Sequence, residues 1–192
     1  MSGTAGDRLT WLRVPTEDEL PEAVLDLWAP SFEKLGFVPN VLRLYALRPN
    51  HLLAWNAHYE ELMKGDSGLA KAEREMIAVV VSVANECAYC TAAHSAALRK
   101  LTKDPVLADA IAADHRSAAV EPRVRAMLDY AVKLTVRPKE MIEADVQALR
   151  TAGWTDDDVM DIAEVTGMFN MSNRMASGLG WAPNPEYESL GR

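Results

Sequence analysis

The sequence predicts an all-α protein, a single-domain bundle of about eight or nine helices over residues 1–192. Apolar residues recur three and four positions apart, and no segment sustains the apolar–polar alternation of a half-buried strand. Prolines and glycines fall where such helices would begin and end. The three valines at residues 79–81 favour a strand locally, but strong helix formers flank them, so we expect buried helix.

These boundaries place the elements in order. Gly36 is expected to end the first helix, and Asn40 and Asn85 are expected to cap later ones. An extended arm is expected over residues 1–19 and an irregular tail over residues 181–192. The helices are expected at residues 21–36 with a break or restart at Pro30, 41–47, 51–64, 71–84, 86–101, 105–113, 122–137, 138–153 and 155–177.

Composition and charge argue against several classes of protein, namely those that bind nucleic acid, lie in a membrane or are secreted. The net charge of −8 and the pI near 5.0 argue against binding to nucleic acid or anionic membranes, because both need basic patches. The longest nearly apolar run, residues 76–84, is far shorter than the roughly 20 residues that span a bilayer. The first eight residues lack a signal-peptide pattern. We therefore expect a cytoplasmic protein with no nucleic-acid or membrane partner.

The two cysteines of the chain, Cys87 and Cys90, form a Cys-x-x-Cys pair. Such a pair cannot build the disulfide framework of a secreted domain, and it suits a reducing compartment as a redox motif or part of a metal site. His94 follows Cys90 by four residues. In a helix this spacing places all three side chains on one face, so we expect the chemistry of the protein there.

The expected helix start favours a thiolate on this face. If Asn85 caps a helix that begins at Glu86, Cys87 is the second residue of that helix and Cys90 the fifth. The free amide groups and the positive end of the helix dipole stabilise a thiolate at these positions. His94 can accept the proton of Cys90, whereas the carboxylate of Glu86 slightly opposes ionisation.

The spacing also bears on a disulfide between the two cysteines. Helical side chains three residues apart have Cβ atoms about 5–6 Å apart, whereas a disulfide needs about 3.8 Å. Closing the bond must distort the first turn of the helix. A disulfide between Cys87 and Cys90 is therefore expected to open and close readily.

Two other roles for the cluster stay open. Cys87, Cys90 and His94 could supply three ligands to zinc, with Glu75 or another histidine as the fourth. A structural zinc site usually needs a second ligand pair with its own spacing, and the sequence has none. The same residues could instead serve a non-catalytic scaffold that responds to oxidation. We expect no bound metal or cofactor.

The wider pattern of residues matches a known family. Glu75 stands twelve residues before Cys87, which begins the Cys-x-x-Cys-x-x-x-His motif that ends at His94. In this pattern the chain resembles the alkylhydroperoxidase D/carboxymuconolactone decarboxylase superfamily. Residues 73–77 and 85–94 resemble the signature of this superfamily. The chain is similar in particular to the branch of uncharacterised peroxidase-related proteins, in residues 11–15, 36–40, 48–49 and 169–175.

The resemblance implies a fold, an assembly and an activity. The fold is an alkylhydroperoxidase D-like bundle with a redox hairpin at residues 69–101, and the subunits assemble as homo-trimers or hexamers. Cys90 would attack a hydroperoxide, and Cys87 would donate a proton and then close the disulfide. His94 would deprotonate Cys90, and Glu75 would complete the proton relay. A dithiol or protein reductant, which the sequence does not identify, would restore the thiols.

Tyr89 departs from the family pattern, because alkylhydroperoxidase D carries a histidine at this position between the cysteines. A tyrosine can line the site and donate a hydrogen bond, but it cannot take a proton at neutral pH. His51 and His58 are expected to be surface or half-buried polar residues. Arg174 is expected to be buried and to pair with an acid in residues 73–75.

Overall fold

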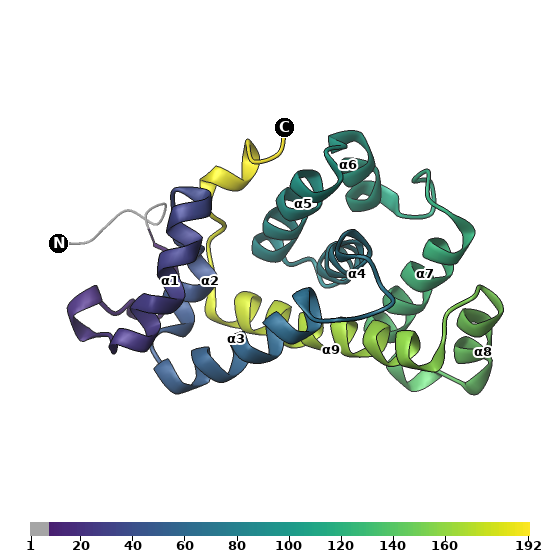
Figure 1. Cartoon of the computed structure of the whole chain (residues 1–192), viewed down its shortest axis with the longest axis horizontal. Coiled ribbons are helices and arrows are strands. Elements are labelled where there is room, and N and C mark those ends of the chain that lie inside the picture. The colour runs from purple at the N-terminus through teal and green to yellow at the C-terminus, as the bar shows by residue number, and fades with distance from the viewer. Residues whose placement is uncertain (1–7) are drawn as a thin grey trace.

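The computed structural model describes residues 8–192, which contain α-helices, short 3-10 helices and no strand (Figure 1). The predicted all-α fold is confirmed. The α-helices are α1 (Glu22–Leu35), α2 (Asn40–Tyr45), α3 (Pro49–Lys64), α4 (Lys71–Ala84), α5 (Ala88–Thr102), α6 (Pro105–Asp114), α7 (Pro122–Val136), α8 (Glu143–Thr151) and α9 (Asp156–Leu179). The 3-10 helices are η1 (Glu17–Glu19), η2 (Pro138–Glu140) and η3 (Pro185–Glu188).

Helix α4 is the centre of the fold. Helices α5, α6, α7 and α9 pack around it, so that α4 appears end-on in the middle of the bundle (Figure 1). The side chains from Arg74 to Ser82 are all buried. The valines at residues 79–81 lie in the main hydrophobic core, so the expectation of buried helix rather than strand is confirmed. Glu75 sits on this helix and is therefore held by the core rather than by a loop.

The buried charge of Arg74 is satisfied by backbone carbonyls at the start of α4. Its guanidinium donates hydrogen bonds to the carbonyl oxygens of Leu62, Gly65 and Leu69, at 3.0, 2.9 and 3.1 Å. A buried charge is tolerated only when such partners are present. Arg74 therefore ties the end of α3 and the turn at residues 65–70 to the helix that carries Glu75.

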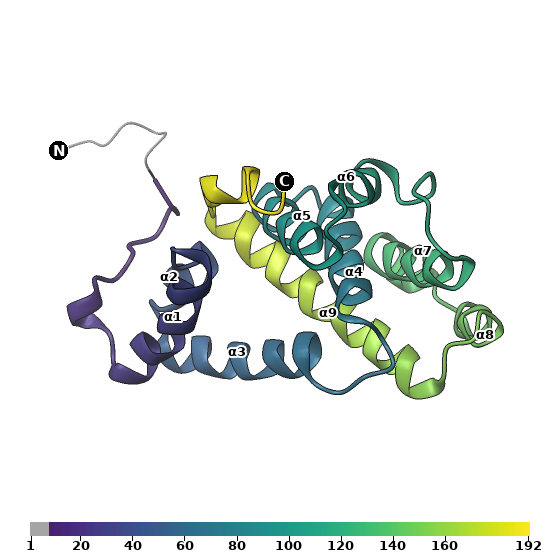
Figure 2. The ribbon, with the colours of Figure 1, turned by 45° about the horizontal axis from the view of Figure 1, so that its top comes forward.

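Helices α1 and α2 lie at one end of the molecule, and α3 runs from them to the side of α9 (Figure 2). Trp28, Leu42 and Leu52 form part of a small hydrophobic core of their own. Trp55 of α3 contacts both this cluster and the main core, and its ring stacks on Tyr45 at a centroid distance of 5.0 Å. The two parts of the molecule are therefore joined by aromatic packing along α3.

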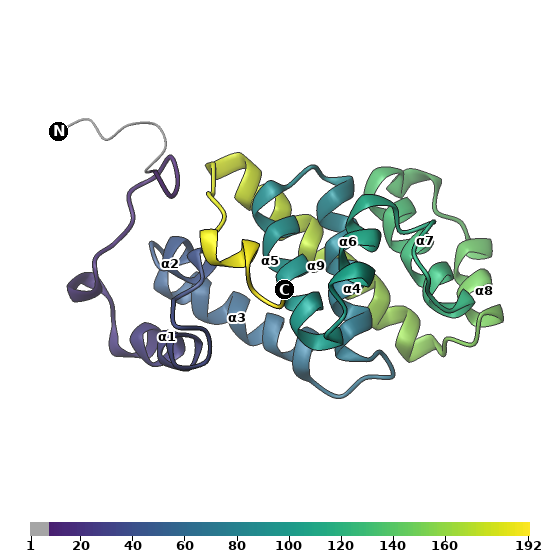
Figure 3. The ribbon, with the colours of Figure 1, turned by 90° about the horizontal axis from the view of Figure 1, so that it is seen from above.

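The C-terminal segment turns back at Gly180 and runs between α2 and α5 (Figure 3). Gly180 has a φ of +63°, and a side chain there would collide with the ring of Trp11. The amide of Trp11 donates to the carbonyl of Leu179 at 3.0 Å, which fastens the described part of the N-terminal arm to the end of α9. The tail expected to be irregular contains η3, and residues 1–7 of the arm lie outside the described residues.

Several boundaries differ from the sequence prediction, as at residues 138–153, where η2 precedes a shorter α8. Pro30 does not break α1, which continues through it and gives up only the hydrogen bond that proline cannot donate. Asn40 is the first residue of α2 rather than its cap, because its side chain donates to the carbonyl of Ala182 at 3.0 Å.

Over residues 8–192, no helix is both long and apolar enough to span a membrane.

Candidate active site

The turn between α4 and α5 positions the two cysteines. Helix α5 begins at Ala88, so Cys87 is its N-cap and Cys90 its third residue, not the second and fifth as predicted. Glu86 adopts a left-handed conformation, with φ of +53°, that reverses the chain between the helices. The side chain of Asn85 turns back to the carbonyl of Val81 at 3.0 Å, so it cannot cap α5.

The two thiols are free, buried and hydrogen-bonded to each other. The hydrogen bond from the Cys90 thiol is the main cause that lowers the pKa of Cys87 to about 6. The backbone N–H of Cys90 and the hydroxyl of Ser177 also stabilise the Cys87 thiolate, while burial opposes it. The pKa of Cys90 is raised, first because its thiol donates to Cys87 and then because it is buried. The shared proton therefore rests on Cys90.

His94 and Glu75 meet across the interface between α5 and α4. The Nδ1 atom of His94 lies 2.8 Å from Oε2 of Glu75, and both side chains are mostly buried. Since a carboxylate can only accept a hydrogen bond, Nδ1 must carry the proton, which leaves Nε2 free to bind or transfer another. Phe169 packs edge-on against the imidazole at a centroid distance of 4.3 Å and fixes the plane of the ring.

A partly open cavity of about 650 Å³ lies over this site, between the α1–α3 part and the bundle. Of the two thiols, it is Cys90 that lines the cavity, and His94 lines the same wall one turn further along α5. Aromatic side chains make up much of the remaining wall, namely Trp55, Tyr59, Tyr89, Phe169, Trp181 and Tyr187. A molecule in this cavity therefore reaches Cys90 and His94 together.

Tyr89 is anchored at the edge of the cavity by its hydroxyl group. The backbone N–H of Val41 donates to this oxygen at 2.8 Å, so the side chain links α5 to α2. The ring packs edge-on against Trp181 and Tyr187 at centroid distances of 5.9 and 6.4 Å. Burial raises the pKa of Tyr187 to about 12 and that of Tyr89 well above its usual value, so both phenols remain protonated at neutral pH.

Two solved structures that share the fold and more than 40% of the sequence decide the family. A structure described as the alkylhydroperoxidase AhpD core of an uncharacterised peroxidase-related protein from Ralstonia eutropha JMP134 is 44% identical. It superposes with a TM-score of 0.93 over 96% of this chain and 97% of that chain. An uncharacterised peroxidase-related protein from Silicibacter sp. TM1040 is 46% identical, with a TM-score of 0.94 over 100% of both chains. The chain belongs to the alkylhydroperoxidase D/carboxymuconolactone decarboxylase superfamily.

Two other comparisons concern a family model and a structure that is much less similar in sequence. The model of the carboxymuconolactone decarboxylase family matches residues 49–133, which include the cysteine pair. The debrominase Bmp8 shares the superfamily fold, with a TM-score of 0.80 over 96% of each chain, but only 16% sequence identity. A comparison with curated protein sequences gave no significant match.

Several residues of this superfamily site were not found by sequence reasoning. Asn173 of α9 hydrogen-bonds to the thiol of Cys90, and its amide also donates to Ser82 at 3.1 Å. Asn85 donates to Asn173 at 2.9 Å, so the turn before Cys87 is tied to the helix behind the thiols. In the sequence, Asn173 is marked only as a polar residue within an apolar helix, in the segment of residues 169–175 that resembles the family.

Other sequence expectations have different outcomes. Arg174 is exposed and bonds to the carbonyl and side chain of Asn170, so the predicted buried pair with an acid in residues 73–75 is wrong. The helical turn places Asn173, not Arg174, toward the site.

His51 and His58 are exposed, as expected. Among residues 8–192, no group of three or more His, Cys, Asp and Glu side chains could hold a metal ion, so the geometry does not support the zinc alternative.

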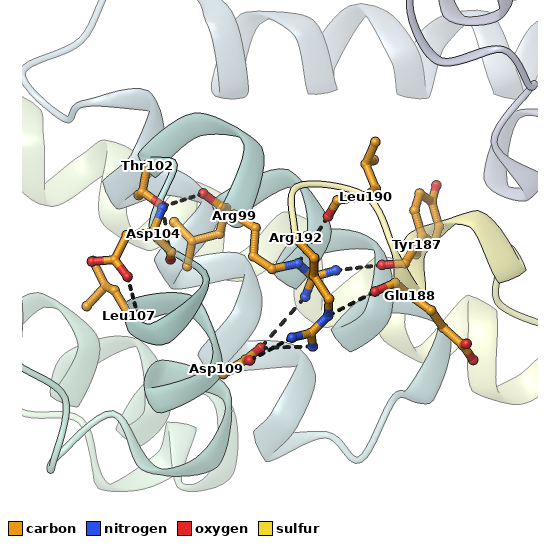
Figure 4. A network of polar contacts seen from close by, with 10 residues as sticks. Arg99, Thr102, Asp104, Leu107, Asp109, Tyr187, Glu188, Leu190 and Arg192 are labelled. Carbon is orange, nitrogen blue, oxygen red and sulfur yellow. Dashed lines mark hydrogen bonds and ion pairs between the residues drawn. The ribbon is translucent and has the colours of Figure 1, made fainter.

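Tyr187 reaches the site because Arg99 docks the C-terminal segment on α5 (Figure 4). The buried guanidinium of Arg99 donates to the carbonyl of Tyr187 and, at 3.0 Å, to that of Leu190. Arg192 adds an exposed ion pair to Asp109 at 3.1 Å. One helix thus carries Cys90, His94 and the side chain that holds Tyr187 in the wall of the cavity.

Replacing Cys90 by Ala should raise the pKa of Cys87 from about 6 toward the ordinary thiol value, because the main hydrogen bond to its thiolate is removed. The measurement is the ultraviolet absorbance of the thiolate as a function of pH. Cys87→Ala should abolish the acidic transition, and Thr91→Ala, on the same turn, should leave it unchanged. A midpoint that stays near 6 in Cys90→Ala would contradict the assignment.

Replacing Arg99 by Met should release the C-terminal segment, because two buried carbonyls lose a charged donor. We expect amide hydrogen exchange at Tyr187 and Leu190 to become about tenfold faster or more, with helix content unchanged. Arg192→Met, which removes an exposed pair from the same network, should have little effect. Equal exchange in both variants would show that Arg99 does not hold the segment.

Proposed function

We propose that the protein is a thiol-dependent peroxidase that reduces hydroperoxides through Cys87 and Cys90. The observation that carries this proposal is the wall of the cavity, where the Cys90 thiol and the His94 imidazole lie together. Cys87, with its lowered pKa, is hydrogen-bonded to Cys90 behind that wall. The membership of the superfamily supports the same chemistry.

The first stage oxidises Cys90. Cys90 passes its proton to the Cys87 thiolate, and the Cys90 thiolate formed in this way attacks the terminal oxygen of the hydroperoxide. The O–O bond breaks, Cys90 becomes a sulfenic acid, and the alkoxide leaves. The Cys87 thiol returns the proton to the alkoxide, which departs as an alcohol. Cys87 thus acts first as base and then as acid, a role that a thiol with a pKa near neutrality suits.

The second stage closes and reopens the disulfide. The Cys87 thiolate attacks the Cys90 sulfenic acid, and the hydroxide that leaves takes a proton that Nε2 of His94 has bound from solvent, which gives water. A dithiol, free or carried by a protein, then reduces the disulfide by thiol–disulfide exchange and is itself oxidised to a disulfide. Each cycle therefore converts one hydroperoxide and one dithiol to an alcohol, water and a disulfide.

Glu75 acts as a positioning residue for His94. Its carboxylate accepts the Nδ1 hydrogen bond, which turns Nε2 toward the cavity and stabilises the charged imidazolium after proton uptake. The proton enters and leaves through His94 because Tyr89, in the place of the family histidine, stays protonated. We propose that this shorter relay distinguishes this protein from alkylhydroperoxidase D itself.

The same site could serve a non-catalytic scaffold that forms the disulfide once and waits for slow reduction, as a sensor does. Turnover separates the two functions, since both share the first oxidation. The superfamily resemblance also implies homo-trimers or hexamers, and the cysteine pair suits a reducing compartment such as the cytoplasm. Trp11 and Phe32, which are 64% and 60% exposed, are apolar side chains that a neighbouring subunit could cover.

Cys90→Ser should lower peroxide consumption with a dithiol by at least about a thousandfold, because the attacking sulfur is lost. Cys87→Ser should consume about one equivalent of peroxide, more slowly because the base for Cys90 is lost, and stop with a sulfenic acid on Cys90. Ser95→Ala, a buried change on the same helix, should keep native turnover. Native turnover in Cys90→Ser would overturn the proposal, and a native protein that forms the disulfide but does not turn over would favour the sensor.

Glu75→Gln should lower kcat by roughly tenfold to a hundredfold and leave KM unchanged, because Glu75 acts through His94 rather than on the substrate. Glu75→Asp should recover part of the loss by restoring the charge. Glu73→Gln, which changes the cap at Ala70 on the same helix, is the matched control and should keep kcat. A rise in KM alone, or equal losses in Gln and Asp variants, would count against the relay.

A further inference from the structure

The cavity is far larger than hydrogen peroxide requires. Its volume of about 650 Å³ is in the range of pockets that hold whole organic molecules, whereas a water-sized molecule occupies about 30 Å³. Aliphatic and aromatic side chains make up most of the lining, among them Leu27, Leu35, Leu42, Trp55 and Phe169. Such a cavity gains binding energy from an apolar body of substantial size.

The charges around this apolar space are mainly positive. Three lysines and one glutamate line it, although the whole chain carries a net charge of −8. The lysines come from three helices, with Lys34 on α1, Lys64 on α3 and Lys100 on α5. All three are exposed, so they form the rim rather than the floor of the cavity. Basic groups that converge on one opening of an acidic protein favour an anion there.

Only one of the three lysines is neutralised by its neighbours. Lys64 pairs with Glu60 at 2.6 Å, within α3. Among the ion pairs of residues 8–192, none includes Lys34 or Lys100. These two ammonium groups flank the cavity from opposite parts of the molecule, the α1–α3 part and the bundle. They are available to a ligand that reaches out of the cavity.

We propose that the cavity takes a bulky amphipathic anion, a hydroperoxide whose apolar body fills the aromatic space and whose carboxylate faces Lys34 and Lys100. The reacting hydroperoxide group would lie on the apolar body, next to Cys90 and His94. The chemical step rests on the proposed peroxidase function. The hydroperoxide becomes an alcohol, the dithiol supplies both electrons, and the carboxylate is unchanged.

Binding can be tested apart from catalysis with compounds that contain no peroxide. Isothermal titration of the native protein with hexanoate, octanoate and decanoate should show affinity rising roughly fourfold for each added methylene. Decanol, the neutral counterpart, should bind about tenfold more weakly than decanoate. A parallel titration with 4-phenylbutanoate shows whether the apolar body is preferred as a chain or as an aromatic ring.

Variants locate the site. The double variant Lys34→Glu/Lys100→Glu should lower the affinity for decanoate about tenfold and change that for decanol less than about twofold. Lys71→Glu/Lys139→Glu alters the net charge equally at exposed lysines outside the cavity lining and should leave both affinities unchanged. Ala97→Phe fills part of the cavity and should weaken both ligands.

Each other result overturns the inference. It is wrong if no carboxylate binds, if decanol binds as well as decanoate, or if the rim variant and its charge-matched control behave alike. The failure of the proposed function looks different. If decanoate binds as expected but the native protein consumes no hydroperoxide with any dithiol, the peroxidase function fails and the ligand class stands. If hydroperoxide is consumed but decanoate does not bind, only the ligand class fails.

Discussion

Cys87 occupies the N-cap of α5, where the backbone N–H of Cys90 in the first turn helps to stabilise its thiolate and so to lower its pKa. The Cys90 thiol, one turn later, can donate to the same sulfur because both groups face the start of one helix. This single junction lowers the pKa of one cysteine and raises that of the other. The acidic and the cavity-lining thiol are therefore different residues.

That division is useful for peroxide chemistry. A thiolate that is always exposed to the cavity would meet many oxidants, whereas here the resting charge lies on Cys87, behind the wall. In the proposed mechanism, the hydrogen bond between the two thiols carries the proton from Cys90 to Cys87 when a hydroperoxide reaches Cys90. The pair formed by Glu75 and His94 comes from the adjoining helices α4 and α5, so the same hairpin holds all four groups in register.

The rest of the fold supplies the substrate space. The α1–α3 part contributes one wall, α9 contributes Phe169, and the C-terminal segment contributes Trp181 and Tyr187. Arg99 joins this segment to α5, so the walls and the thiols share one support. The family fold is common to proteins with different chemistry, and it is the lining of this cavity that would decide the substrate.

Local sequence determined the all-α fold, most helix bounds, and the placing of Cys90 and His94 one turn apart on the same helix, because helical periodicity and proline and glycine signals act over a few residues. Only the family resemblance predicted that Glu75 and His94 act together. Their contact depends on α4 and α5 lying side by side, which is a feature of the tertiary structure. Tertiary structure alone decided the start of α5, since the contacts of Asn85 with α9 compete with capping. It also decided the places of Asn173 and Tyr187, far along the chain from the cysteines, because long-range packing leaves no periodic trace in a sequence.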